Sequence, residues 1–125
     1  MYSADVNKII PFSSVDGPGN RTAIFLQGCN FNCKYCHNAE TRNLCINCMD
    51  CVPTCPTAAL SNKDGKVVFE PQKCIACDTC IKVCRHGATP RIVKMTSKET
   101  FDKICENVPF IRGITFSGGE CSLYP

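Results

Sequence analysis

The sequence predicts an α/β fold, in which one strand–helix–strand unit is interrupted after its first strand by a long cysteine-rich segment. Residues 21–27 are mostly apolar, as expected for a strand buried in a parallel sheet. A helix is expected to start near residue 97, and residues 113–117 read as a second short strand. These three segments would form a βαβ unit, with the interruption at residues 45–84.

The first predicted strand, Arg21 to Gln27, follows a turn cluster, Asp16-Gly17-Pro18-Gly19. Gly28 ends the apolar run, and a cysteine-containing loop follows at the carboxyl end of the strand. Because α/β folds place their functional sites at the carboxyl ends of parallel strands, this loop is the first candidate for chemistry.

Three cysteines in this loop, Cys29, Cys33 and Cys36, have the spacing C-x3-C-x2-C. They supply three thiolates with no obvious fourth, so a 4Fe–4S cube bound here would keep one iron without a protein ligand. Such an iron can bind a substrate, as catalytic metal sites keep an open coordination position. A structural zinc site or a chance grouping is the alternative, because zinc also accepts short cysteine spacings.

Eight further cysteines form two runs with the spacing C-x2-C-x2-C-x3-C. They are Cys45, Cys48, Cys51 and Cys55, then Cys74, Cys77, Cys80 and Cys84. This doubled run is the pattern of bacterial two-cluster ferredoxins, in which the fourth cysteine of each run ligates the other cluster. The expected ligand sets are Cys45, Cys48, Cys51 and Cys84 for one cluster, and Cys74, Cys77, Cys80 and Cys55 for the other. The second run ends in Cys84-Arg85 rather than Cys-Pro, which removes no ligand.

Between the two runs, residues 59–69 are expected to form a hairpin around the Asp64-Gly65 turn. A module this small has little hydrophobic core, so bound clusters would have to hold it together.

The predicted helix begins with a capping-box sequence, Thr96-Ser97-Lys98-Glu99. An apolar stripe follows at i, i+3, i+4 and i+7, formed by Phe101, Ile104, Cys105 and Val108. The stripe predicts that the helix packs on the sheet, with Cys105 buried as a small apolar residue. Cys121 is expected to be a small filler near the site rather than a further ligand.

Composition and charge narrow the class of function. Thirteen cysteines in 125 residues indicate a disulfide scaffold or a metal protein, and their spacing favours a metal protein. The net charge is +3, and the basic stretch between residues 82 and 98 lacks interleaved aromatics, so it is interpreted as a solvated face. We find no secretion signal in residues 1–16 and no apolar stretch of ~20 residues. A reducing, anaerobic cytoplasm is therefore expected, with no nucleic-acid or membrane partner.

Together these motifs resemble the amino-terminal part of a glycyl-radical-enzyme activating enzyme of the radical S-adenosylmethionine (SAM) superfamily. The resemblance covers essentially the whole chain. It rests on residues 16–29, on the three cysteines followed by His37-Asn38, on the two-cluster insert, and on Ser117-Gly118-Gly119-Glu120. The implied fold is the first βαβ unit of a partial (β/α) radical SAM barrel with a ferredoxin-like insert. The barrel start would span residues 1–44, the insert 45–90, and the helix with the second strand 91–125.

The resemblance implies three 4Fe–4S clusters and SAM as cofactors. Cys29, Cys33 and Cys36 would hold the catalytic cluster. Gly118, Gly119 and Glu120 would lie beside the SAM amino group, and Tyr35 would lie near the adenine. Reductive cleavage of SAM would give a 5′-deoxyadenosyl radical that takes a hydrogen from a glycine Cα of a partner glycyl-radical enzyme, with a flavodoxin or ferredoxin as electron donor. The cofactors carry this chemistry, so no side chain is assigned a catalytic role.

The roles of three residues stay open at this point. Asp16 and Arg21 could face the glycine loop of the partner or could serve only the turn and the strand end. His37 could support the cluster or simply pack. Because a complete barrel needs about 200 residues or more, the chain is expected to be a fragment that is inactive alone. The alternative function is a ferredoxin-like electron carrier, which would need neither the three-cysteine loop nor the Gly-Gly-Glu triplet.

Overall fold

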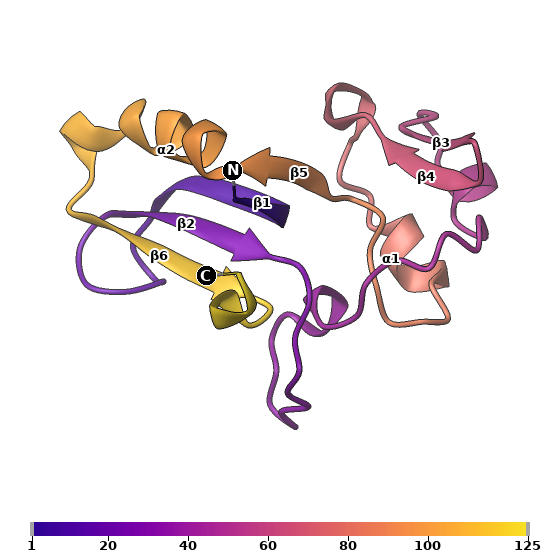
Figure 1. Ribbon diagram of the computed structural model, residues 1–125, viewed down its shortest axis with the longest axis horizontal. Coiled ribbons are helices and arrows are strands. Elements are labelled where there is room, and N and C mark those ends of the chain that lie inside the picture. The colour runs from indigo at the N-terminus through magenta and orange to yellow at the C-terminus, as the bar shows by residue number, and fades with distance from the viewer. Residues whose placement is uncertain (1, 125) are drawn as a thin grey trace.

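The computed structural model describes residues 2–124 as a sheet with a helix packed on it and a cysteine-rich insert beside it (Figure 1). The main sheet has the strand order β5-β1-β2-β6. Its strands are β1 (Ser3–Ser13), β2 (Arg21–Leu26), β5 (Val93–Thr96) and β6 (Gly113–Gly118). Helix α2 (Ser97–Cys105) lies between β5 and β6 in the chain.

The strands β2 and β6 pair in parallel, from Arg21↔Gly113 to Leu26↔Gly118. Helix α2 precedes β6, so the two strands and the helix form the expected crossover. Residues 22–26 of β2 are all buried, because neighbouring strands flank β2 on both sides and Ile24 and Leu26 contribute to the core. The predicted α/β class is confirmed.

Helix α2 starts as its sequence predicts. The Thr96 hydroxyl accepts a hydrogen bond from the Glu99 amide (3.1 Å), and the Glu99 carboxylate accepts one from the Thr96 amide (2.8 Å). These two bonds form a complete capping box, which satisfies backbone donors that the first turn of a helix leaves unpaired.

The main sheet differs from the two-stranded arrangement that the sequence predicts. β1 pairs antiparallel with both β2 and β5, so the sheet is mixed and four-stranded. From the sequence, only a turn is expected in residues 1–20, where the structure has β1. Register shifts at Val6/Lys8 and Ile10/Ser13 break the alternation by which a strand is recognised in a sequence. β5 is four residues long, which is too short to show a period.

The apolar stripe of α2 is only partly buried, which corrects the sequence-based expectation. Ile104 packs against the core formed by Val6, Ile24 and Leu26. Phe101 is 63% exposed, and Cys105 is exposed rather than buried. The helix contacts β5 and β1 along one side, and nothing among residues 2–124 covers the rest of its stripe (Figure 1).

The insert contains the predicted hairpin, β3 (Leu60–Lys63) and β4 (Lys66–Phe69), and a short helix, α1 (Thr79–Val83). Asp64 and Gly65 both have positive φ at its turn, as a two-residue hairpin loop of this kind requires. The insert core consists of Leu60 with Cys51 and Cys80, surrounded by partly buried apolar side chains. Short 3₁₀ turns occur at Ala39–Thr41, Val52–Thr54, Pro71–Lys73, Val108–Phe110 and Cys121–Leu123.

The two ends of the insert are joined where it leaves the sheet. Asn43 and Ala88 form a parallel bridge, and the Asn43 side-chain amide donates to the His86 carbonyl (2.9 Å). The chain therefore enters and leaves the insert side by side, and we call this pair of segments, at residues 43 and 86–88, the neck of the insert (Figure 1). Within residues 2–124, no helix has the length and apolar character needed to cross a bilayer.

Candidate cysteine sites

The three-cysteine loop begins at the carboxyl end of β2, directly beside the carboxyl end of β6. The Gly119 amide donates to the Leu26 carbonyl (2.7 Å), and the Glu120 amide donates to the Gly28 carbonyl (2.9 Å). The Gly-Gly-Glu triplet and the cysteine loop are therefore joined through the backbone. The carboxyl ends of two neighbouring parallel strands lie side by side here, and α/β folds place their ligand sites at such ends.

This junction requires glycine at two positions. Gly118 has φ +89°, and a Cβ there would lie 2.6 Å from the backbone of Leu26. A Cβ on Gly119 would collide with the Gly28 carbonyl oxygen. The two glycines thus allow the two loops to approach more closely than any larger residue would.

The thiols of the loop face outward. Cys29 is half-buried, whereas Cys33 and Cys36 are exposed. The Phe31 amide donates to the Cys29 sulfur (3.4 Å), and the Cys36 amide donates to the Cys33 carbonyl (3.3 Å). Tyr35 is 84% exposed and His37 is exposed as well, so neither packs into the protein.

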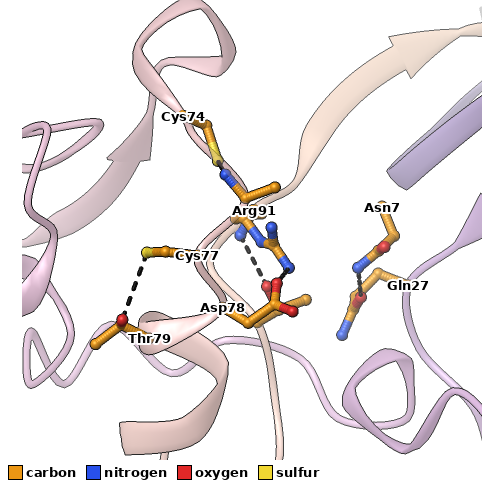
Figure 2. Close-up of polar contacts among 9 residues, drawn as sticks. Asn7, Gln27, Cys74, Cys77, Asp78, Thr79 and Arg91 are labelled. Carbon is orange, nitrogen blue, oxygen red and sulfur yellow. Dashed lines mark hydrogen bonds and ion pairs between the residues drawn. The ribbon is translucent and has the colours of Figure 1, made fainter.

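Gln27 anchors this loop, a role that the sequence analysis missed. Its carboxamide is fully buried and donates to the Glu40 and Asn43 carbonyls (2.7 Å each), while its oxygen accepts from Asn7 (3.1 Å; Figure 2). The Tyr124 hydroxyl donates to the Gln27 carbonyl (2.6 Å). The available signal was an uncharged polar residue at the end of an apolar buried strand, because such a group must find partners.

Asp16 and Arg21 both make hydrogen bonds to other residues of the chain. The Arg21 guanidinium donates to the Thr115 hydroxyl (2.8 Å) and the Ile114 carbonyl (2.6 Å) of β6. The Asp16 carboxylate accepts from the Ser13 hydroxyl. Arg21 therefore joins the start of β2 to β6, and the Thr115 hydroxyl donates to the Asp16 carbonyl (2.8 Å), which favours the structural interpretation of both residues.

Glu120 of the Gly-Gly-Glu triplet and Cys121 beside it also make contacts within the chain. The Glu120 carboxylate accepts from the Ser122 amide (3.0 Å), which lowers the pKa of Glu120. Cys121 is partly buried against the core cluster of Val6, Ile24 and Leu26, as a small filler would be.

The eight insert cysteines line two cavities. The first is lined by Cys45, Cys48, Cys51 and Cys84. The second is lined by Cys55, Cys74, Cys77 and Cys80. Each cavity thus gathers three thiols from one run and the fourth from the other.

Both runs shape their backbone in the same way. The second residue after the first cysteine of each run, Asn47 or Ala76, has positive φ, and so does the residue after the second cysteine, Met49 or Asp78. Asn47 and Ala76 each direct an amide at the first sulfur of the run, at 3.4 Å. Left-handed conformations cost non-glycine residues about 1–2 kcal/mol each. Their repetition around the thiols indicates a built site.

Burial raises the pKa of one thiol in each cavity. Burial raises the pKa of Cys51 to about 11, and nearby thiolates add to this, while burial also raises the pKa of Cys80. A hydrogen bond with the Thr79 hydroxyl (3.4 Å) lowers the pKa of Cys77 (Figure 2). Loading a metal on the free thiols would therefore release protons from the buried pair.

The arrangement of donors suits a cluster better than a single ion. Across residues 2–124, no three His, Cys, Asp or Glu side chains converge closely enough to hold one metal ion. A structural zinc needs four ligands around one point. The four thiolates of a cube bind different irons, so they can surround a cavity instead.

Comparison with known proteins agrees with this geometry. The profile of the 4Fe–4S dicluster domain matches residues 44–88. The choline trimethylamine-lyase activating enzyme of Oleidesulfovibrio alaskensis is 34% identical over 91% of the chain. The indoleacetate decarboxylase activating enzyme of Tractidigestivibacter scatoligenes is 33% identical over 91%, and the benzylsuccinate synthase activating enzyme of Thauera aromatica is 31% identical over 96%. The chain is a homologue of the glycyl-radical enzyme activating enzymes.

The predicted resemblance to the glycyl-radical enzyme activating enzymes is confirmed. The matches of this activase homologue span 42–44% of the length of the three relatives, so less than half of each relative has a counterpart in the chain.

The basic stretch of the activase homologue is largely paired with acids. Arg85 binds Asp50 (2.6 Å), Arg91 binds Asp78 (2.7 Å) and Lys98 binds Asp102 (2.7 Å). Because each of these cations lies beside a carboxylate, the positive electrostatic potential that could attract an anionic partner is reduced. This favours the interpretation of the stretch as a solvated face.

Proposed function

We propose that the chain is the part of a radical SAM activase that binds three 4Fe–4S clusters and SAM. The whole enzyme would cleave SAM reductively and generate a glycyl radical on a partner enzyme. The observation that carries the proposal is the junction of the three-cysteine loop with the Gly-Gly-Glu triplet at the carboxyl ends of β2 and β6.

Each motif has a distinct place in this proposal. Cys29, Cys33 and Cys36 would hold the catalytic cluster, which supplies one electron and an iron free to bind SAM. Their exposure at the sheet edge leaves room for a cluster and a substrate. Gly118, Gly119 and Glu120 would receive the SAM amino group through backbone atoms, and the exposed Tyr35 ring would contact the adenine.

The two insert cavities would hold the other clusters. Their donor sets support Cys45, Cys48, Cys51 and Cys84 for one cluster and Cys55, Cys74, Cys77 and Cys80 for the other. The insert would carry electrons from a flavodoxin or ferredoxin to the catalytic cluster. We propose the division into residues 1–44, 45–90 and 91–125 on the same basis.

The setting follows from this chemistry. The activity belongs to a longer protein, of which this chain would be a fragment, with a glycyl-radical enzyme as its protein substrate and an oxidoreductase reaction type. Exposed thiols and clusters require a reducing, anaerobic cytoplasm. The relatives activate different decarboxylases, lyases and synthases by name, and the contacts described above do not favour one of these partners.

The second candidate function is a ferredoxin-like electron carrier. The paired cavities of the insert favour it, and the dicluster profile covers residues 44–88. A carrier would not need the glycine-dependent junction at Gly118 and Gly119, so that junction favours the activase.

A SAM titration separates the two functions. The chain is reconstituted anaerobically and reduced, and its EPR spectrum is recorded with and without SAM. We expect SAM to change the spectrum, Cys36→Ala to abolish the change, and the matched variant Cys77→Ala to retain it. A wild-type-like response of the Cys36→Ala protein would refute the site, and no response in any of the proteins would favour the carrier.

A further inference from the structure

An aspartate–arginine pair stands beside each insert cavity, but the two pairs differ in burial. The Arg85 side chain is 75% exposed and binds Asp50 (2.6 Å). The Arg91 side chain is only 22% exposed and binds Asp78 (2.7 Å). Arg91 also lines the second cavity directly, together with Asp78.

The Arg91 guanidinium is held among thiols. Figure 2 shows it between Cys74 and Asp78, with Cys77 nearby. Its Nη2 atom donates to an Asp78 carboxylate oxygen (2.7 Å), and an arginine side chain keeps its proton in proteins. Arg91 is therefore a fixed positive charge beside the second cavity.

The first cavity has no arginine in its lining. Asp50 lines it, and its partner Arg85 lies outside the lining and is exposed to solvent. Solvent screens exposed charges strongly and partly buried charges much less. The cation at the second cavity should thus act on its contents more strongly than the exposed cation acts on the first.

A nearby cation stabilises the more negative of two redox states. A 4Fe–4S cluster gains one negative charge when it takes an electron, and local charge and hydrogen bonds to sulfur are the protein's means of setting its potential. We propose that Arg91 raises the reduction potential of the cluster held by Cys55, Cys74, Cys77 and Cys80, so that this cluster is reduced before the other insert cluster. The inference rests on the proposed function, because it requires both insert clusters.

The step is a one-electron transfer. A low-potential one-electron reductant, such as Ti(III) citrate, loses one electron for each cluster reduced. No bond to carbon or hydrogen is formed or broken. Arg91 keeps its proton throughout and stabilises the reduced state by its charge.

A potentiometric titration followed by EPR tests the inference on the reconstituted full chain. It is repeated in Cys36→Ala, which removes the third signal. We expect Arg91→Gln to lower one midpoint potential by at least about 59 mV, which corresponds to a tenfold change in the one-electron redox equilibrium. Asp78→Asn should raise the same potential, and Arg91→Lys should stay close to wild type.

The matched control is Arg85→Gln, which removes the same charge from the exposed pair. It should change either insert potential far less than Arg91→Gln does. Equal shifts in the two variants, or an unchanged potential in an Arg91→Gln protein with full iron content, would overturn the inference. Iron and sulfide analysis separates this outcome from a failure of the proposed function, in which the wild-type insert would not load two clusters at all.

Discussion

The buried carboxamide of Gln27, at the end of β2, connects β1 with the segment that follows the cysteine loop. Gln27 binds the Glu40 and Asn43 carbonyls after the loop and the Asn7 side chain in β1. Asn43 in turn binds His86 at the far end of the insert. The loop and the neck of the insert are therefore positioned by a continuous set of hydrogen bonds that begins at Gln27.

Replacing Gln27 by leucine should destabilise the chain markedly. The substitution removes the partner of two carbonyls and one amide in partly buried hydrogen bonds, and each group left unpaired costs about 1–3 kcal/mol. We expect the free energy of unfolding to fall by about 3 kcal/mol in urea denaturation of the reconstituted protein. Gln72→Leu, the same exchange at an exposed site, is the control, and equal effects of the two would show that Gln27 has no anchoring role.

Gly119 tests the junction of the two loops. A methyl group at this position collides with the Gly28 carbonyl, so Gly119→Ala must push the Gly-Gly-Glu triplet away from the cysteine loop. We expect the SAM-induced EPR change to be lost while the insert clusters load normally, because the displaced triplet would no longer lie beside the cysteine loop, where we propose that SAM binds.

Gly65→Ala is the matched control for this substitution. Gly65 also needs glycine, but only for its φ of +78°, since no atom lies within 4 Å of the place that an added methyl group would take. Its replacement should cost about 1–2 kcal/mol of stability and leave the response to SAM intact. A normal SAM response in Gly119→Ala would show that the close approach has no function.

At the scale of elements, the sequence predicted those whose signals are local. The capping box at Thr96 and Glu99 and the Asp64-Gly65 turn need only neighbouring residues, and both are present. The strands β1 and β5 depend on pairing with segments distant in the chain, so they were missed. The exposure of Cys105 was missed for a related reason, because a helix pattern shows an apolar face but not what covers it.

At the sites, cysteine spacing was the informative signal, because thiol ligands must come from specific positions. It cannot show Gln27 or Arg91, since their importance arises from burial and from partners far away in sequence. Which cavity holds the cation likewise depends on tertiary structure, although both arginines are visible in the sequence.

The insert should hold its clusters more firmly than the three-cysteine loop holds its own. Each insert cavity has four thiols, and Cys51 and Cys80 are buried in a common core. The loop has three thiols, two of them exposed. A loaded chain should contain about twelve irons in three cubes. We expect stepwise chelation to remove about four first, together with the response to SAM, and loss of the insert clusters first would contradict this order.

At the scale of the whole molecule, much of the apolar surface is uncovered. Three large apolar side chains are each about half exposed or more: Phe101 of α2, Val108 in the turn after α2, and Phe116 of β6. Among the described residues, β6 is an edge of the sheet and has no partner on its outer side. Unpaired strand edges favour association between copies. The three relatives have more than half of their length outside the matched region.

The last prediction concerns turnover. Cleavage of SAM needs the substrate in a near-attack geometry. In this chain Gly118, Gly119 and Glu120 contact the cysteine loop, but no described strand lies beyond β6 to fix the adenosine. We therefore expect the 125 residues alone to form 5′-deoxyadenosine at least about 100-fold more slowly than a chimaera in which they replace the matching segment of the Thauera aromatica relative. Both proteins are assayed anaerobically with a strong reductant at equal iron content, and the chimaera carrying Cys36→Ala sets the background. Equal rates would show that the strands outside this chain are dispensable for SAM cleavage, whereas a chimaera no faster than its Cys36→Ala variant would place the fault in the cysteine loop itself.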